Sequence, residues 1–227
     1  MYVPNYVPAP IEVPNNVTEE RHLVRLGFIR RVSALHFLSL LIVGGLSMLS
    51  LPTPLLGASV AELGVVLLLL SVIRISTRAT RMDQILSLSL LPLLIVSLAV
   101  IVRTLDQAGW PVWGVAVGAA SAVVYGLCCG RDFSFVGQFF LSLIVSCTVL
   151  AIVATTTGMS PHEAAFLLGA NTAYLFYLVY DCASLLARRR LGEEAAAVVD
   201  LYRDVFNVFG YLVRVARHWR KHRIWAR

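Results

Sequence analysis

The sequence predicts an all-α, polytopic membrane protein, a bundle of seven transmembrane helices. Of the 227 residues, 58% are hydrophobic and only 14% are charged, and the mean hydropathy is +0.78. A water-facing surface on a chain of this length cannot hide so much apolar area. Apolar stretches follow one another from residue 32 almost to the end, with short connectors between them. We therefore expect one membrane domain and little soluble mass.

Seven apolar stretches are interpreted as spans, because a helix that crosses a bilayer needs about 20 mostly apolar residues. In chain order they are Val32–Leu51, Leu56–Ile73, Ile85–Val102, Val112–Leu127, Phe139–Thr155, Ala164–Leu186 and Ala195–Val215. Helix breakers or charges mark the connectors: Pro52 and Pro54, Arg78–Asp83, Asp106–Pro111, Gly130–Asp132, Gly158–Pro161 and Arg188–Glu194. The chain thus divides into a Pro-rich flexible arm (1–20), a seven-helix membrane domain (21–216) and a basic tail (217–227).

Arginines gather on one side of the predicted bundle. They lie before the first span and in the second, fourth and sixth connectors, whereas the first, third and fifth connectors hold only Arg103. Cytoplasmic connectors retain Lys and Arg, so the N-terminus is predicted on the cytoplasmic, or equivalent inner, side. The net charge of +6 is therefore explained by membrane topology. A nucleic-acid partner is not expected, since the basic residues form no stripe with interleaved aromatic residues. The pattern does not distinguish a bacterial inner membrane from an organelle membrane.

The last span is the least apolar, and it is predicted to lie at the centre of the bundle. It contains Asp200, Arg203, Asp204, Asn207 and Arg214, and each charge facing lipid costs about 2.5–3.5 kcal/mol on insertion scales. Most of these residues recur at intervals of three and four, which places them on one helix face. The basic tail then lies on the outer side, unless this segment re-enters and returns the tail to the cytoplasm.

Two aspartates from the last two spans are expected to face each other. Asp181 shares a helix face with Asn171 and Tyr174 in the sixth span, and the short turn that follows makes this span an antiparallel neighbour of the span carrying Asp204. Two carboxylates in a poorly hydrated site cannot both ionise cheaply, so one should keep a proton. Arg74 is the expected counter-ion, which predicts a pH-controlled latch.

Carboxylate oxygens are also the ligands that calcium prefers. Asp181 and Asp204 are therefore predicted to attract calcium transiently, during permeation and without storage. No other cofactor is expected. Asn207, Asp200 and Arg203 complete the candidate ion or proton site, since they lie on or beside the same face of the last span.

Two segments near the end of the chain form a recognisable pattern. They are Tyr180-Asp181 and, after a short basic connector, Leu201–Phe209 followed by Leu212–Arg214. The pattern resembles the ending of the Bax inhibitor (transmembrane Bax inhibitor motif) family, a Tyr-Asp-Thr-Gln segment and then Leu-Tyr-Leu-Asp-Ile-Ile-Asn-Leu-Phe with Leu-Leu-Arg. Arg131–Gly137 and Phe28–Val32 resemble other stretches of the family.

The resemblance implies a seven-helix fold with the last helix central and a calcium-leak activity controlled by pH. It implies that Asp181 and Asp204 are the paired acidic residues and that Arg74 is their basic partner. The chain departs from the family pattern in two places near this pair. Cys182-Ala183 stands where the family has Thr-Gln, and Arg203 adds a charge beside Asp204.

Two functions follow as hypotheses. The first is a pH-sensitive calcium, or proton-coupled ion, leak in the lipid bilayer. The second is a non-conducting accessory or assembly subunit of a larger membrane complex, which the departures favour and for which the aromatic, Pro-rich segment Tyr2–Pro14 would be a docking segment. An enzyme is not expected, because the sequence has no His-Glu-x-x-His motif, nucleophile elbow or phosphate-binding glycine loop.

Overall fold

The computed structural model describes residues 13–49, 56–76 and 81–206, which fold as helices without a strand in these ranges. A short 3₁₀ helix, η1 (Val17–Glu19), precedes the first α-helix, and a second one, η3 (Gly130–Asp132), follows the fourth. The α-helices are α1 (His22–Ser47), α2 (Leu56–Ser76), α3 (Arg81–Gln107), α4 (Gly114–Cys128), α5 (Phe135–Thr156), α6 (Pro161–Arg188) and α7 (Glu194–Phe206).

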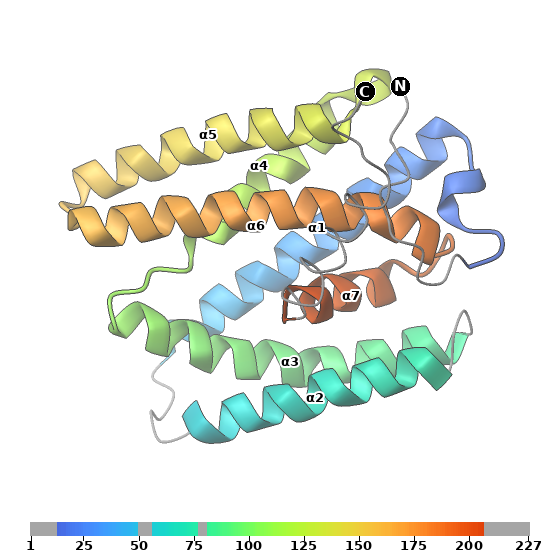
Figure 1. Cartoon of the computed structure of the whole chain (residues 1–227), viewed down its shortest axis with the longest axis horizontal. Coiled ribbons are helices and arrows are strands. Elements are labelled where there is room, and N and C mark those ends of the chain that lie inside the picture. Colours follow the sequence, from blue (N-terminus) through green and yellow to red (C-terminus); the bar gives the residue numbers. More distant parts are fainter. Residues whose placement is uncertain (1–12, 50–55, 77–80, 207–227) are drawn as a thin grey trace, which may run out of the picture.

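The helices form two groups that α1 and α7 join (Figure 1). One group is α4, α5 and α6, which pack on one another, and the other is the pair α2 and α3. Helix α1 contacts α3, α4 and α7, and α7 lies between α6 and α3. Every side chain of α7 from Ala196 to Tyr202 is buried. The described part of the last helix is therefore interior, where the sequence placed it.

Every predicted span in the middle of the chain falls on a helix, although α3, α5 and α6 extend beyond the predicted bounds. The differences at the two ends of the chain concern more than length. Helix α1 already begins at His22, because the arginine-rich flank before the predicted span continues the helix. Helix α7 is described only to Phe206, so the rest of the predicted last span, with Asn207 and Arg214, and the tail lie outside the described residues. By length and composition, three of the described helices can cross a membrane, namely α1, α3 and α5.

Many large apolar side chains of this bundle point outward, and many polar ones point inward. Helix α5 shows the pattern best: Phe140, Leu141, Ile144, Val145, Val149 and Ile152 are exposed, whereas Gln138, Ser142 and Ser146 are buried. This is the reverse of a helix on a water-soluble protein, whose apolar stripe faces the core. Such an apolar outer surface is compatible with the hydrocarbon core of a lipid bilayer.

Residues Val13–Glu20, here the N-terminal strap, pack against the end of α6. The Val13 N–H donates to Ala187 O (3.3 Å), the Val17 N–H donates to Arg189 O (3.0 Å), and the Val17 side chain is fully buried. The last carbonyls of a helix have no partner within it, so the strap serves as the cap of α6. The part of the predicted flexible arm that the structure describes is thus held in place, and residues 1–12 lie outside the described ranges.

Candidate functional site

The last turns of α6 carry an aspartate and an arginine on one face. Asp181 and Arg188 are seven residues apart, which is about two helical turns, and Arg188 Nη2 lies 2.5 Å from Asp181 Oδ1. Ser184, between them, donates its hydroxyl to Asp181 Oδ1 (2.8 Å) and accepts a hydrogen bond from Arg188. The side chain of Asp181 is fully buried, and that of Arg188 is 10% exposed. An isolated charge would be costly at this depth, so each ion depends on the other.

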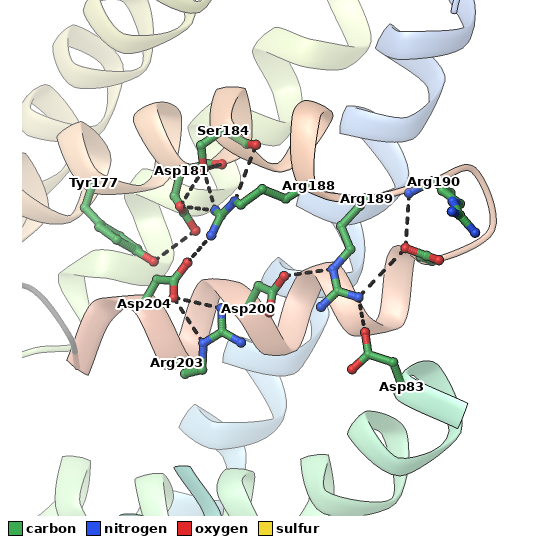
Figure 2. A network of polar contacts seen from close by, with 11 residues as sticks. Asp83, Tyr177, Asp181, Ser184, Arg188, Arg189, Arg190, Asp200, Arg203 and Asp204 are labelled. Atoms are coloured by element: carbon green, nitrogen blue, oxygen red, sulfur yellow. Dashed lines mark hydrogen bonds and ion pairs between the residues drawn. The ribbon is translucent and has the colours of Figure 1, made fainter. Parts of the chain in front are cut away.

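Arg188 also reaches the next helix. Its Nη1 donates to Asp204 Oδ2 at 2.5 Å, so one guanidinium holds the carboxylates of α6 and α7 together (Figure 2). The other oxygen of Asp204 accepts hydrogen bonds from Arg203 Nε (3.1 Å) and Nη2 (3.0 Å). Asp181 and Asp204, which the sequence expected to face each other, are thus brought to one cation.

The pairing continues along α7 to α3. Arg203 Nη2 lies 3.1 Å from Asp200 Oδ1, and Arg189 Nε lies 2.8 Å from Asp200 Oδ2. Arg189 Nη1 binds Asp83 in the first turn of α3 and lies 3.8 Å from Glu193 Oε2. Negative and positive groups therefore alternate through seven side chains, here the ion-pair chain: Asp181, Arg188, Asp204, Arg203, Asp200, Arg189 and Asp83.

Arg189 follows the last residue of α6 and is buried among these carboxylates. Burial by itself would lower its pKa, but the attraction and hydrogen bonds of Asp200 and Asp83 outweigh this effect and raise the pKa of the guanidinium. The group therefore stays charged at every pH at which the protein is folded. Any change of this pairing with pH must come from the carboxylates.

A tyrosine completes the surroundings of Asp181. The Tyr177 hydroxyl lies 3.2 Å from Asp181 Oδ2 and 2.8 Å from the Leu201 carbonyl oxygen, and it has one hydrogen to donate. Asp181 Oδ1 is occupied by Arg188 and Ser184. A proton added to Asp181 Oδ2 would allow that oxygen to donate to Tyr177, and Tyr177 to donate to Leu201. The arrangement thus provides a place for one proton on Asp181.

The sequence-predicted site residues fall into two groups. Asp181, Asp204, Asp200 and Arg203 lie together in the ion-pair chain (Figure 2). Asn207 lies outside the described residues, and so does the side chain of Arg74, although its backbone belongs to α2. For the transient calcium prediction, the described residues contain no group of three His, Cys, Asp or Glu side chains that could hold a metal ion.

Sequence reasoning missed Arg188, Arg189 and Asp83. It assigned all three to connectors, where a positive-inside pattern predicts hydrated side chains, yet the side chain of Arg189 is only 4% exposed. The available signal was the seven-residue spacing that places Asp181 and Arg188 on one face of α6, together with Asp200 and Asp204 in the helix after the turn. Those acidic residues provide the charges that make burial of the arginines tolerable.

The polar face expected on α6 does not point toward a single neighbour. Asn171 binds Ser146 of α5, Tyr174 contacts His36 of α1, and Asp181 meets the ion-pair chain. Ten residues at 3.6 per turn leave Asn171 and Asp181 about 80° apart around the helix. A stripe with that much rotation is divided among three neighbours in a packed bundle.

Comparisons with known proteins agree with these features. The chain is 31% identical over 90 residues to the BI1-like protein of Arabidopsis thaliana, which covers 39% of this chain and 35% of that protein. It is 34% identical over 92 residues to Protein LIFEGUARD 3 of the same plant, covering 39% and 36%, and 30% identical over 90 residues to Protein LIFEGUARD 4, covering 39% and 36%. No family model and no solved structure matches the sequence.

The chain is a relative of Bax-inhibitor-type proteins. The matches span about a third of the length of these curated relatives. The apolar outer faces of its helices and its similarity to these proteins together support a multi-pass integral membrane protein. The buried ion-pair chain therefore lies inside a membrane protein, where ionisable residues commonly mark an ion or proton pathway.

Proposed function

We propose that this Bax-inhibitor-type protein is a seven-span, pH-sensitive cation leak that calcium can use, with its N-terminus on the cytoplasmic side. The observation that carries the proposal is the position of Arg188 between Asp181 and Asp204. A guanidinium between two carboxylates occupies the place of a permeating cation and ties α6 to α7. The form described here is accordingly the closed one.

Protonation is the proposed opening step. A proton on Asp181 Oδ2, beside Tyr177, removes the negative charge that holds Arg188 Nη2. Arg188 then loses the carboxylate that fixes its guanidinium on α6 and keeps Asp204 of α7 as its charged partner, so the guanidinium can move out of the position between the two carboxylates. Acidification therefore opens the leak, and a rise in pH closes it.

The counter-ion in this proposal is Arg188, in place of the Arg74 that the sequence suggested. Arg188 lies on the same helix as Asp181 and is held by Ser184. Calcium would bind the freed carboxylates only briefly, because two carboxylates fall well short of the six to eight oxygen ligands of a storage site.

The test is calcium flux in liposomes that contain the purified protein and an enclosed calcium indicator, measured at pH 6 and pH 8. We expect faster flux at pH 6 for the unaltered protein, and flux without pH dependence for Asp181→Asn. Arg188→Gln should conduct at pH 8. Arg31→Gln is the matched control, since Arg31 forms an exposed ion pair with Glu194. Arg188→Gln that is closed at both values of pH would refute the role of Arg188.

A second candidate is the non-conducting accessory subunit. Asp204 binds two guanidiniums, those of Arg188 and Arg203, so neutralising Asp181 alone leaves Asp204 fully paired. With such pairing, the protein is expected to stay closed to ions at every pH. Absence of flux at both values of pH, for the unaltered protein and for Arg203→Gln, together with co-purification of a membrane partner in mild detergent, would favour this function.

A further inference from the structure

The inward face of α5 is polar along its first half. Gln138, Ser142 and Ser146 follow one another at four-residue spacing and are 2%, 1% and 0% exposed. Leu150 and Ala154 continue the same buried face. Three polar side chains of this helix thus lie in the dry interior of the bundle.

Two hydrogen bonds fix these residues at the contact between α4, α5 and α6. Gln138 Nε2 donates to the Ala122 carbonyl oxygen of α4 (3.1 Å). Asn171 Nδ2 of α6 donates to Ser146 Oγ (2.9 Å), and Asn171 is fully buried. The hydrogen bonds that the two amide N–H groups donate therefore fix both amides. The amide oxygens, Gln138 Oε1 and Asn171 Oδ1, do not take part in these bonds.

Three oxygens in this contact have no hydrogen-bond partner among the described residues: Gln138 Oε1, Ser142 Oγ and Asn171 Oδ1. Ser142 differs in this from Thr148 and Thr155 of the same helix, whose hydroxyls donate to a carbonyl one turn earlier. Buried polar atoms without a partner are rare in folded proteins, and bound water is the usual explanation. Gln138 and Ser142 lie one turn apart on α5, Asn171 of α6 binds Ser146 one turn further on, and both amides lie beside α4, at Ala122 and Gly118. This common location favours one shared ligand.

We propose that the contact between α4, α5 and α6 holds a buried water molecule bound by Gln138, Ser142 and Asn171. Water fits the available groups one for one. Its two hydrogens can be donated to Gln138 Oε1 and Asn171 Oδ1, and its oxygen can accept the Ser142 hydroxyl. A water that makes about three hydrogen bonds is typical of buried sites.

A metal cation fits less well, because all three oxygens belong to neutral groups. A buried cation without a counter-charge is strongly unfavourable. Gly118 of α4 allows the Asn171 amide to lie against the α4 backbone, because an added Cβ there would lie 2.4 Å from Asn171 Oδ1.

Hydroxyl-radical footprinting of the full chain in lipid nanodiscs tests for the water directly, because water bound in the interior generates radicals beside buried side chains. Leu175, fully buried and close to Gly118, is the probe, and Leu94 of α3, equally buried, is the control. We expect severalfold faster labelling of Leu175 than of Leu94, and loss of this excess in the double variant Gln138→Leu, Ser142→Ala. Equal labelling in the unaltered protein would overturn the proposal.

Thermal unfolding supplies a second test whose sign separates the two possibilities. If water satisfies the Ser142 hydroxyl, Ser142→Ala should lower Tm by about 2–4 °C; if the hydroxyl is truly unpaired, its removal should raise Tm. Ser97→Ala is the matched control, because Ser97 is equally buried but donates to Leu93 O (2.9 Å). A higher Tm for Ser142→Ala, or Leu175 labelling that changes when choline replaces sodium, would contradict a bound water.

Discussion

The guanidinium of Arg188 in the last turn of α6 binds Asp204 of α7 at 2.5 Å while its other amino group binds Asp181. One side chain therefore forms one ion pair within α6 and another that joins α6 to α7, in surroundings where single charges are unfavourable. Cation, carboxylates and hydroxyl partners form a unit in which each member makes burial of the others tolerable. The unit is sensitive to the loss of any one member.

Removing only the cation should destabilise the protein strongly. Arg188→Met leaves Asp181 and Asp204 buried without their shared partner, and breaking a buried pair in this way costs about 3–5 kcal/mol. We expect a large fall in Tm, measured in detergent at pH 8. The triple variant Asp181→Leu, Arg188→Met, Asp204→Leu should recover most of the loss. A triple variant as unstable as Arg188→Met would show that packing of the arginine, and not its charge, stabilises the helices.

Arg189 and Asp83 should be energetically coupled, although more than 100 positions separate them in the sequence. The buried ion pair between Arg189 and Asp83 connects the end of α6 to the first turn of α3. Arg189→Met and Asp83→Leu should each lower the free energy of unfolding, and the double variant should lose much less than their sum. A double-mutant cycle on urea unfolding in detergent measures this coupling, which we expect at about 0.5–3 kcal/mol. Additive losses would contradict direct pairing.

Gly118 should not tolerate a methyl group. A Cβ there would lie 2.4 Å from Asn171 Oδ1 and 3.1 Å from Leu175 Cγ, and both residues are fully buried. Overpacking of this kind costs about 1–3 kcal/mol. Gly169→Ala in α6 is the control: nothing lies within 4 Å of its added Cβ, so alanine should be neutral or stabilising by up to about 1 kcal/mol. Thermal unfolding of the two variants side by side decides the point.

The strap should contribute to stability through one side chain and one N–H group of Val17. Val17→Ala removes part of a fully buried side chain and keeps the donor to Arg189 O; we expect a loss of about 1–2 kcal/mol. Val17→Pro removes the donor as well, at the first position of a 3₁₀ turn where proline is sterically acceptable, and should cost more. Leu23→Ala, at an exposed position of α1, is the control. Equal effects of alanine and proline would assign the whole contribution to the side chain.

The helices of this protein are largely readable from sequence, because each apolar stretch is bounded by local signals. Ser160, Pro161 and Glu163 form a capping box at the start of α6, and such signals act within one turn. The start of α1 was missed because helix continues through residues that are too polar for lipid. Membrane propensity and helix propensity are different properties, and the span boundary follows only the first.

The site was only partly predictable. Asp181, Asp204 and Asp200 could be proposed because a carboxylate in an apolar segment is unusual by itself. The role of Arg188 could not, since an arginine run at a helix end is equally compatible with hydrated side chains that extend to the membrane interface. Which carboxylate binds which arginine depends on how α6, α7 and α3 are rotated about their axes, and that rotation is set by packing.

The sequence alone determined that this is a helical membrane protein with a resemblance to Bax-inhibitor-type proteins and with acidic residues in its last two helices. Hydropathy and local motifs carry that information because they depend on neighbouring residues along the chain. Tertiary structure alone decided that Arg188 lies between Asp181 and Asp204, that Arg189 reaches Asp83, and that Asn171 turns toward α5. These contacts join residues from different helices, and their geometry follows from the packing of whole helices, which no local stretch of sequence specifies.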